Sequence, residues 1–277
     1  MPPLNLAALS AQFPSCLVPT AGGAISYRRA GTGPALVLLH GIGSASGSWL
    51  RQLAQLQATH TVLAWDAPGY GRSAPLPGAA PGAADYGRRV WQWLDALDLP
   101  AAPLTLVGHS LGALMGAAAA LQQPGRVKRL VLLSPAQGYG AADPALRQDK
   151  LQARLDNLRT LGPRGMADQR GAAMLSPAAP AELVDYVKGL MAQVDPAGYT
   201  QAAHMLAGGD LAALLAPPHV PVTVASGAAD TITPASSCEA LARHAGLPYV
   251  SLGPVGHACA LEAADQVNRL LEREENP

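Results

Sequence analysis

The chain has 277 residues, of which 49% are hydrophobic and 14% charged, which is enough apolar material for a sizeable core and too little charge for a disordered chain. Lysine plus arginine and aspartate plus glutamate both number 19, so the formal net charge is zero. A protein that binds a phosphate backbone normally carries a basic surplus, and we therefore expect no nucleic-acid partner.

Short apolar runs of strand length alternate along the chain with segments of helical periodicity. Uninterrupted apolar strands are buried on both faces, as in a parallel sheet covered by helices. In chain order, we expect strands at residues 24–28, 35–39, 61–65, 104–107, 130–133, 222–225 and 249–252, and helices at 48–59, 85–97, 110–123, 234–245 and 263–275. This alternation predicts the α/β class with a mostly parallel, doubly wound sheet.

The alternation stops between residues 139 and 208, where the sequence predicts only helices. We expect these at 144–161, 164–175, 180–194 and 196–206. About seventy residues of helix between two strands of one sheet predict a helical cap at 139–208, inserted into a core domain of residues 1–138 and 209–277. The inserted segment holds seven basic and seven acidic residues, so its composition indicates no preference for an anionic or a cationic substrate.

No apolar run reaches the roughly 18 residues of a membrane-spanning helix. The first arginine is Arg28, so no basic region of a signal peptide is apparent. We therefore expect a cytoplasmic protein without a membrane partner, either a monomer or a homodimer. Cys16, Cys238 and Cys259 fit neither a disulfide framework nor a zinc site, and we expect no metal.

The most informative segment is Gly108-His109-Ser110-Leu111-Gly112, which follows an apolar strand and opens a helix. It is a G-x-S-x-G motif in the strand–turn–helix context that presents a serine above a sheet. The glycines let neighbouring backbone approach closely, and the helix N-terminus favours negative charge that develops nearby. We interpret Ser110 as a nucleophile, and the alternative is an ordinary glycine-rich turn.

A serine needs a base that is held by a third group before it becomes a good nucleophile. Asp230 follows the strand at 222–225, and His257 follows the strand at 249–252. Both lie after the carboxyl ends of strands, where open α/β sheets place their sites. The order Ser, Asp, His along the chain predicts a catalytic triad. The alternatives are a helix-capping aspartate and a loop histidine, and neither explains both residues together.

An acyl-transfer site also needs N–H groups that stabilise the oxyanion. One donor is expected to be the amide of Leu111, which follows the nucleophile. The second is expected from the loop His40-Gly41-Ile42-Gly43 after the first core strand, and we choose the amide of Ile42. The alternative for this loop is an ordinary strand-to-helix turn.

With these motifs in place, the chain resembles the α/β-hydrolase superfamily, in the branch that contains 3-oxoadipate enol-lactonases, meta-cleavage C–C hydrolases and related esterases. The matching stretches are 39–43, 65–73, 108–112, 229–230 and 256–257. The resemblance implies the α/β-hydrolase fold and a Ser-His-Asp mechanism. It does not identify the substrate, because this fold hosts many chemistries.

Differences between this sequence and some members of the family narrow the range of expected activities. A serine at the nucleophile position argues against haloalkane dehalogenases and epoxide hydrolases. His109 stands where C–C hydrolases often have an asparagine, and residues 44–46 replace their proline-rich extension. The resemblance also implies a structural role for Asp66 and a supporting hydrogen bond from His40.

The sequence also offers candidates for a substrate pocket under the predicted cap. These candidates are Gly41, His109, Tyr139, Leu190, Met191, Tyr199, His204 and Met205. His109 is also expected to pack at the nucleophile turn. Cys259 is more typical of a small buried residue than of a second nucleophile, although thiol reagents could act through it.

We therefore expect a serine hydrolase of small-molecule carboxylic esters or lactones that needs no cofactor. A C–C bond hydrolase is the first alternative, and it requires polar cap residues such as Arg147 or Arg170 aimed at a substrate carboxylate. Further alternatives are a perhydrolase or cofactor-free haloperoxidase, and a ligand receptor built on a hydrolase fold.

Overall fold

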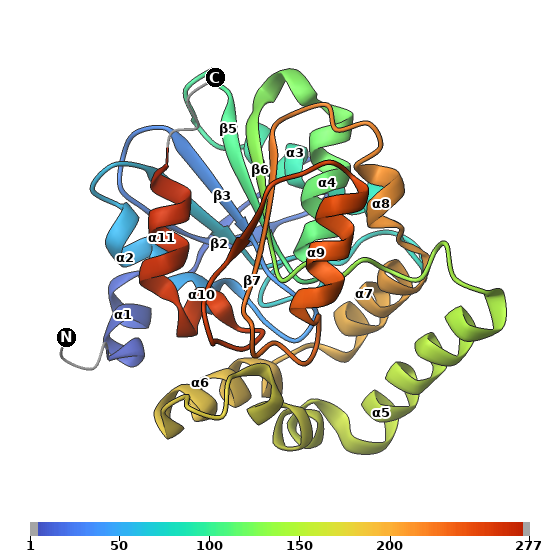
Figure 1. Ribbon diagram of the computed structural model, residues 1–277. Helices are drawn as coiled ribbons and strands as arrows, with labels where there is room; N and C mark the ends of the chain where they lie inside the picture. Colours follow the sequence, from blue (N-terminus) through green and yellow to red (C-terminus); the bar gives the residue numbers. More distant parts are fainter. Residues whose placement is uncertain (1–4, 274–277) are drawn as a thin grey trace.

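The structure is a computed structural model that describes residues 5–273. Its centre is an eight-stranded sheet in the order β1-β2-β4-β3-β5-β6-β7-β8 (Figure 1). The strands are β1 Cys16–Val18, β2 Ile25–Ala30, β3 Ala35–Leu39, β4 Thr61–Trp65, β5 Leu104–His109, β6 Val127–Leu133, β7 Val222–Ser226 and β8 Tyr249–Ser251. All pairings from β4 to β8 are parallel, whereas β1–β2 and β2–β4 are antiparallel. The predicted α/β class with a mostly parallel sheet is confirmed.

Helices cover both faces of this sheet, which explains why its central strands are apolar throughout. Leu36, Val37, Leu38 and Leu39 of β3 are all fully buried. One face packs against α1 Leu6–Gln12, the 3₁₀ turn η1 Ser46–Trp49, α2 Leu50–Leu56, α10 Cys259–Glu262 and α11 Ala264–Glu272. The other face packs against α3 Ala83–Asp95, α4 Gly112–Gln122, α8 Leu211–Leu214 and α9 Ala235–His244.

The main differences from the predicted elements lie at the N-terminal end. No helix or strand was expected before residue 24, yet α1 and β1 lie there. The helix expected at 48–59 begins with η1 and ends at Leu56. A three-residue strand such as β1 has no periodicity to detect, and its pairing with β2 makes it a strand.

The segment between β6 and β7 forms a helical insertion, residues 139–208, at the lower side of Figure 1. It contains α5 Pro144–Arg170, the short 3₁₀ turn η3 Ala172–Met174, α6 Ala181–Ala192 and α7 Pro196–Gly208, and α5 packs against both α6 and α7. The two helices expected at 144–161 and 164–175 are the limbs of α5. Gly162 has non-helical backbone angles (φ 62°, ψ 177°), and Pro163 has no N–H to continue the hydrogen-bond ladder, so α5 bends there.

Across residues 5–273, none of the helices combines the length and the hydrophobicity that crossing a membrane would require.

Candidate active site

Ser110 lies on a tight turn between β5 and α4. Its φ is +51°, in the left-handed region that non-glycine residues rarely adopt. The turn is held at close quarters by the glycines on either side. A Cβ on Gly112 would lie 2.2 Å from the carbonyl oxygen of Leu39, and one on Gly108 would lie 2.5 Å from that of Gly112. The G-x-S-x-G pattern is therefore required by packing, and it projects the serine above the end of the sheet.

The side chains of Asp230 and His257 contact each other near this turn. Nδ1 of His257 lies 2.9 Å from Oδ2 of Asp230, and both side chains are buried. The other carboxylate oxygen accepts the backbone N–H groups of Ile232 at 2.8 Å and Thr233 at 2.9 Å. Burial would raise the pKa of Asp230, but hydrogen bonds from His257 and Thr233 outweigh it and hold the pKa at about 2. The carboxylate is ionised at neutral pH and fixes the imidazole with Nδ1 as a donor.

Ser110 and His257 line the same cavity, although the Ser110 hydroxyl has no hydrogen bond to His257 within residues 5–273. Hydrogen bonds of this kind are often long in ligand-free enzymes and shorten in the reacting complex. Because Nδ1 is engaged by Asp230, Nε2 is the imidazole nitrogen that remains for proton transfer.

A second histidine connects the serine turn to the histidine loop. Nε2 of His109 lies 2.8 Å from the backbone carbonyl oxygen of His257, and the two rings are 4.8 Å apart at their centroids. Because a carbonyl only accepts, Nε2 of His109 is the protonated nitrogen. Burial is the largest cause that lowers the pKa of His109, to about 3. The ring is therefore neutral and positions the loop that carries His257.

His40 supports the loop after β3 in a comparable way. Its Nε2 accepts the Ala67 N–H at 2.9 Å, so its Nδ1 carries the proton and donates to the Gly41 carbonyl at 2.8 Å. Asp66 lies beneath this loop, where it accepts the Ser46 N–H at 2.8 Å. Asp66 is buried and does not line the cavity, which fits the expected structural role.

The two amides chosen from the sequence as oxyanion donors lie on either side of the serine. In the described part of the chain, neither the Ile42 N–H nor the Leu111 N–H has a protein acceptor. A Cβ on Gly41 would lie 2.9 Å from Cβ of Ser110, so the loop after β3 passes directly beside the nucleophile turn. Within residues 5–273, both N–H groups are therefore free to bind a ligand.

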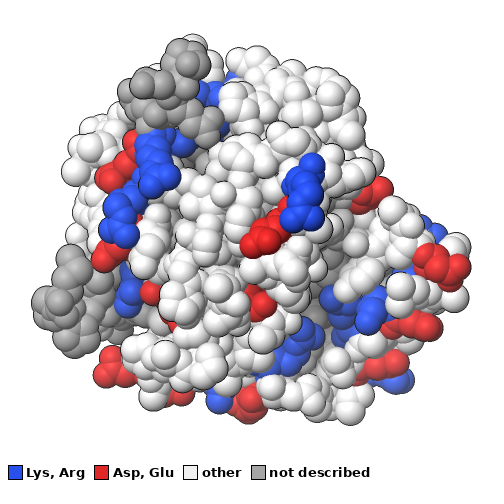
Figure 2. All heavy atoms as spheres, in the orientation of Figure 1, with Lys and Arg blue, Asp and Glu red and all other residues white. Residues whose placement is uncertain are grey.

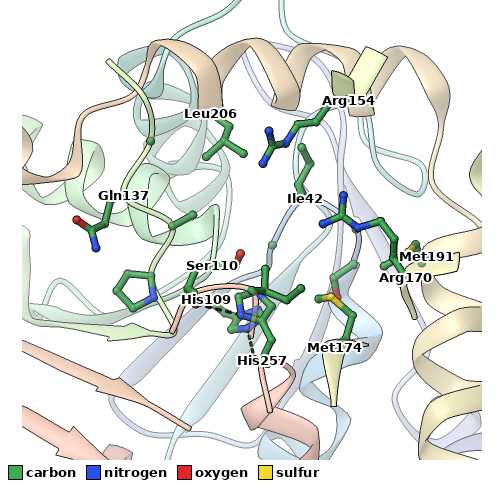
Figure 3. Close-up of a pocket in the computed structure, with 18 of the residues that line it drawn as sticks. Ile42, His109, Ser110, Gln137, Arg154, Arg170, Met174, Met191, Leu206 and His257 are labelled. Carbon is green, nitrogen blue, oxygen red and sulfur yellow. Dashed lines mark hydrogen bonds between the residues drawn. The ribbon is translucent and has the colours of Figure 1, made fainter. Parts of the chain in front are cut away.

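The cavity in front of Ser110 has a volume of about 270 Å³ and lies between the strand ends and the helical insertion (Figure 3). A cavity of this size accommodates a small molecule rather than a polymer. Of the candidates chosen from the sequence, five line it: Gly41, His109, Tyr139, Met191 and Tyr199. Across residues 5–273, no group of three His, Cys, Asp or Glu side chains could hold a metal ion.

Three predicted pocket residues, Leu190, His204 and Met205, do not line this cavity. Leu190 lines a smaller cavity that adjoins the first one and shares His109 and Met174 with it. On α7 the cavity residues Tyr199 and Leu206 are seven positions apart and share a face, whereas His204 and Met205 lie more than 100° around the helix. Met205 is buried in the core instead.

The sequence also missed residues that the cavity wall contains. Arg170 lines the cavity, but Arg147 does not, and Arg154 takes part although it was not singled out. Met166, Met174, Val194 and Leu206 add apolar surface. Helical periodicity places Met166 and Arg170 on one face, but only the bend of α5 brings Arg154 to the same cavity.

Comparison with known proteins identifies the family of this chain and finds solved structures with the same fold. The model of the alpha/beta hydrolase family matches residues 36–270. A protein of Variovorax paradoxus (strain S110), provisionally named carbamate hydrolase RutD, is 34% identical over 251 residues, covering 86% of this chain and 90% of the relative. The abhydrolase domain-containing protein abhd-5.2 of Caenorhabditis elegans is 36% identical over 126 residues, which are 44% of this chain and 28% of that protein.

Solved structures resemble most of the chain. The enol-lactonase from Burkholderia xenovorans LB400 has a TM-score of 0.79 and 24% identity, covering 93% of this chain and 98% of the other. A thermophilic esterase from Thermogutta terrifontis has a TM-score of 0.81 and 22% identity, covering 93% and 96%. At these identities the likeness shows the fold alone. The family match over most of the sequence and the full-length relative establish that this chain belongs to the alpha/beta hydrolase family and is a hydrolase.

Proposed function

We propose that the protein is a serine hydrolase of small-molecule carboxylic esters or lactones, with Ser110, His257 and Asp230 as its triad. The observation that carries the proposal is the buried contact of 2.9 Å between Asp230 and His257, facing the same cavity as a serine whose φ is +51°. A strained serine beside a charge-stabilised histidine is the arrangement that acyl transfer requires.

In the proposed mechanism, Nε2 of His257 takes the hydroxyl proton as Oγ of Ser110 attacks the carbonyl carbon. The carbonyl oxygen becomes an oxyanion that the N–H groups of Ile42 and Leu111 stabilise. The tetrahedral intermediate then collapses, the bond to the leaving oxygen breaks, and His257 gives its proton to the leaving alcohol. Asp230 keeps the imidazole in the correct tautomer and stabilises its cationic form.

The second half-reaction returns the enzyme to its starting state. Water loses a proton to Nε2 of His257 and attacks the acyl carbon on Ser110. The acyl–oxygen bond breaks, Ser110 recovers its proton from His257, and the carboxylic acid leaves. We infer that the helical insertion, residues 139–208, serves as a cap over this reaction, because its side chains form the outer wall of the cavity.

The test is hydrolysis of p-nitrophenyl esters from acetate to octanoate, combined with labelling by a fluorophosphonate. Wild-type protein should hydrolyse at least one ester and take up one label on Ser110, as located by peptide mass spectrometry. Ser110→Ala should lose both, whereas Ser251→Ala, an exposed serine on β8, should keep both. Turnover that persists in folded Ser110→Ala would refute the serine mechanism.

Two substrate alternatives share this machinery. The name of the Variovorax relative suggests a carbamate, whose carbonyl the same serine could attack. A C–C hydrolase requires a polar residue aimed at a substrate carboxylate, and the position of Arg170 on the cavity wall favours it. Cleavage of aryl carbamates or of a vinylogous diketone by wild type, at rates above those for every ester, would shift the assignment accordingly.

A further inference from the structure

We propose that the substrate carries a carboxylate group, which the guanidinium groups of Arg154 and Arg170 bind while its scissile carbonyl lies at Ser110. This inference rests on the proposed function of the same cavity and names the substrate class. Both arginines come from α5, on opposite sides of its bend at Gly162, and both line the cavity.

The two guanidinium groups point into the space above Ser110 (Figure 3). Both side chains are half-buried rather than extended into solvent. The charges of both arginines affect the same side chain, Tyr199. Burial raises the pKa of Tyr199, and the charges of Arg170 and then Arg154 oppose that rise. All three side chains line the same cavity.

Neither cation has a carboxylate partner in the described part of the chain. Arg154 donates to the backbone carbonyl of Lys150 at 3.0 Å, and its guanidinium lies 5.5 Å from the ring centroid of Tyr139. Arg170 makes no hydrogen bond and no ion pair within residues 5–273. By contrast, Arg159 on the same helix pairs with Asp156 at 2.9 Å. Other basic residues of the insertion, such as Arg147 and Arg164, also make no ion pair within residues 5–273, so what sets Arg154 and Arg170 apart is that they line the cavity.

Apart from Arg154 and Arg170, the cavity wall within residues 5–273 carries no charged side chain that could balance the two guanidinium groups. No aspartate or glutamate lines the cavity, and its surface on the insertion side includes Met166, Met174, Met191, Val194 and Leu206. The acidic residues of the insertion are exposed, apart from half-buried Asp156. The neutral total charge of the insertion therefore hides a local surplus of two positive charges. Figure 2 shows Lys and Arg atoms bordering the hollow beside α5.

Two half-buried cations without counter-ions beside an apolar wall favour an anionic ligand, because a carboxylate replaces the solvation they lose. Planar guanidinium groups bind carboxylates through paired, charge-assisted hydrogen bonds. The charge is confined to one side of the cavity, so a ligand with an apolar chain and a terminal carboxylate fits its polarity. Such a ligand would be oriented with its acid end on α5 and its ester or lactone at Ser110.

The experiment compares matched ester pairs that differ only in the chain end. Mono-p-nitrophenyl esters of succinate to suberate are measured beside p-nitrophenyl esters of the monoacids of equal carbon number. For at least one chain length, wild type should prefer the acid-ended ester by about 10-fold or more in kcat/KM. Arg170→Met should lower that value about 10-fold, and Arg154→Met/Arg170→Met about 100-fold, as expected for charge-assisted hydrogen bonds.

The neutral esters provide the internal reference, and their kcat/KM should change less than about twofold in the arginine variants. Arg147→Met is the matched control, because Arg147 lies on α5 outside the cavity, and it should keep the preference. Arg170→Lys should retain part of the preference, since it keeps the charge. The inference is overturned if no acid-ended ester is preferred, or if the preference survives in the double variant, while the Ser110-dependent esterase stands.

A binding measurement separates failure of this inference from failure of the proposed function. If no ester is hydrolysed, Ser110→Ala protein is heated with glutarate, adipate, valerate or inorganic phosphate at constant ionic strength. A rise in Tm with a dicarboxylate that is absent in the double arginine variant supports the carboxylate site without any turnover. No rise, or a rise with phosphate alone, overturns it.

Discussion

Protonation of His109 should make the protein lose stability in mild acid. Burial holds the pKa of this histidine at about 3, against 6.5 for an exposed imidazole. The unfolded chain therefore binds a proton at pH values where the native protein does not. The stabilising contribution is complete above about pH 7.5 and is lost as the pH falls through 6.5 towards 3.

The size of the effect follows from the two pKa values. One pKa unit corresponds to about 1.36 kcal/mol, and pH 4.5 lies two units below the pKa of the unfolded imidazole, so His109 alone should lower the free energy of unfolding by about 2.7 kcal/mol between about pH 8.0 and 4.5. His40, whose pKa is also lowered by burial, adds a loss of the same sign. Because His40 is present in both proteins, its part cancels when wild type is compared with His109→Gln.

Urea unfolding followed by tryptophan fluorescence measures this difference at pH 8.0, 6.5, 5.5 and 4.5. Glutamine can still donate to the His257 carbonyl, but it does not titrate. We expect the stability of His109→Gln to fall by about 2.7 kcal/mol less than that of wild type between about pH 8.0 and 4.5, and the two to run parallel above about pH 7.5. Parallel curves across the whole range would refute the assignment of a buried, neutral His109.

Three further outcomes follow from particular contacts. Gly112→Ala should lower the free energy of unfolding by about 3 kcal/mol in the same urea assay, because the new Cβ would lie 2.2 Å from the Leu39 carbonyl oxygen. A Cβ on Gly125 would meet nothing within 4 Å, so Gly125→Ala should change the free energy of unfolding by less than about 0.5 kcal/mol. A thiol reagent should modify the exposed Cys16 without loss of activity. Cys259 should not react, because it is fully buried and burial raises its pKa to about 12. Inhibition by the reagent that disappears in Cys259→Ala would contradict this expectation. Thr233→Val should lower kcat/KM about 10-fold, because the Thr233 hydroxyl contacts Asp230 at 2.9 Å and His257 at 3.1 Å. Thr233→Ser keeps the hydroxyl and should keep the wild-type kcat/KM. Equal activity of all three proteins would show that the hydroxyl is dispensable.

Much of the fold was readable because it is encoded locally. A continuous apolar run such as β3 can be satisfied only by burial on both faces, so its residues indicate a central strand before any contact is known. The turn at Ser110 is likewise local, since glycines at 108 and 112 permit the approach of β3 and α4. The sequence also placed Asp230 and His257 after strand ends, and their separation of 2.9 Å follows once the parallel sheet aligns those ends.

The order of the first strands and the character of the cavity wall depended on tertiary structure. Strand β1 exists through its pairing with β2, which no local pattern announces. The composition of the helical insertion is neutral, but packing rotates its acidic residues towards solvent and turns Arg154 and Arg170 inward. Short-range sterics and hydrogen bonds determine where a helix begins and bends. Which of its faces meets a cavity is decided by the elements packed around it, and that is a property of the whole fold.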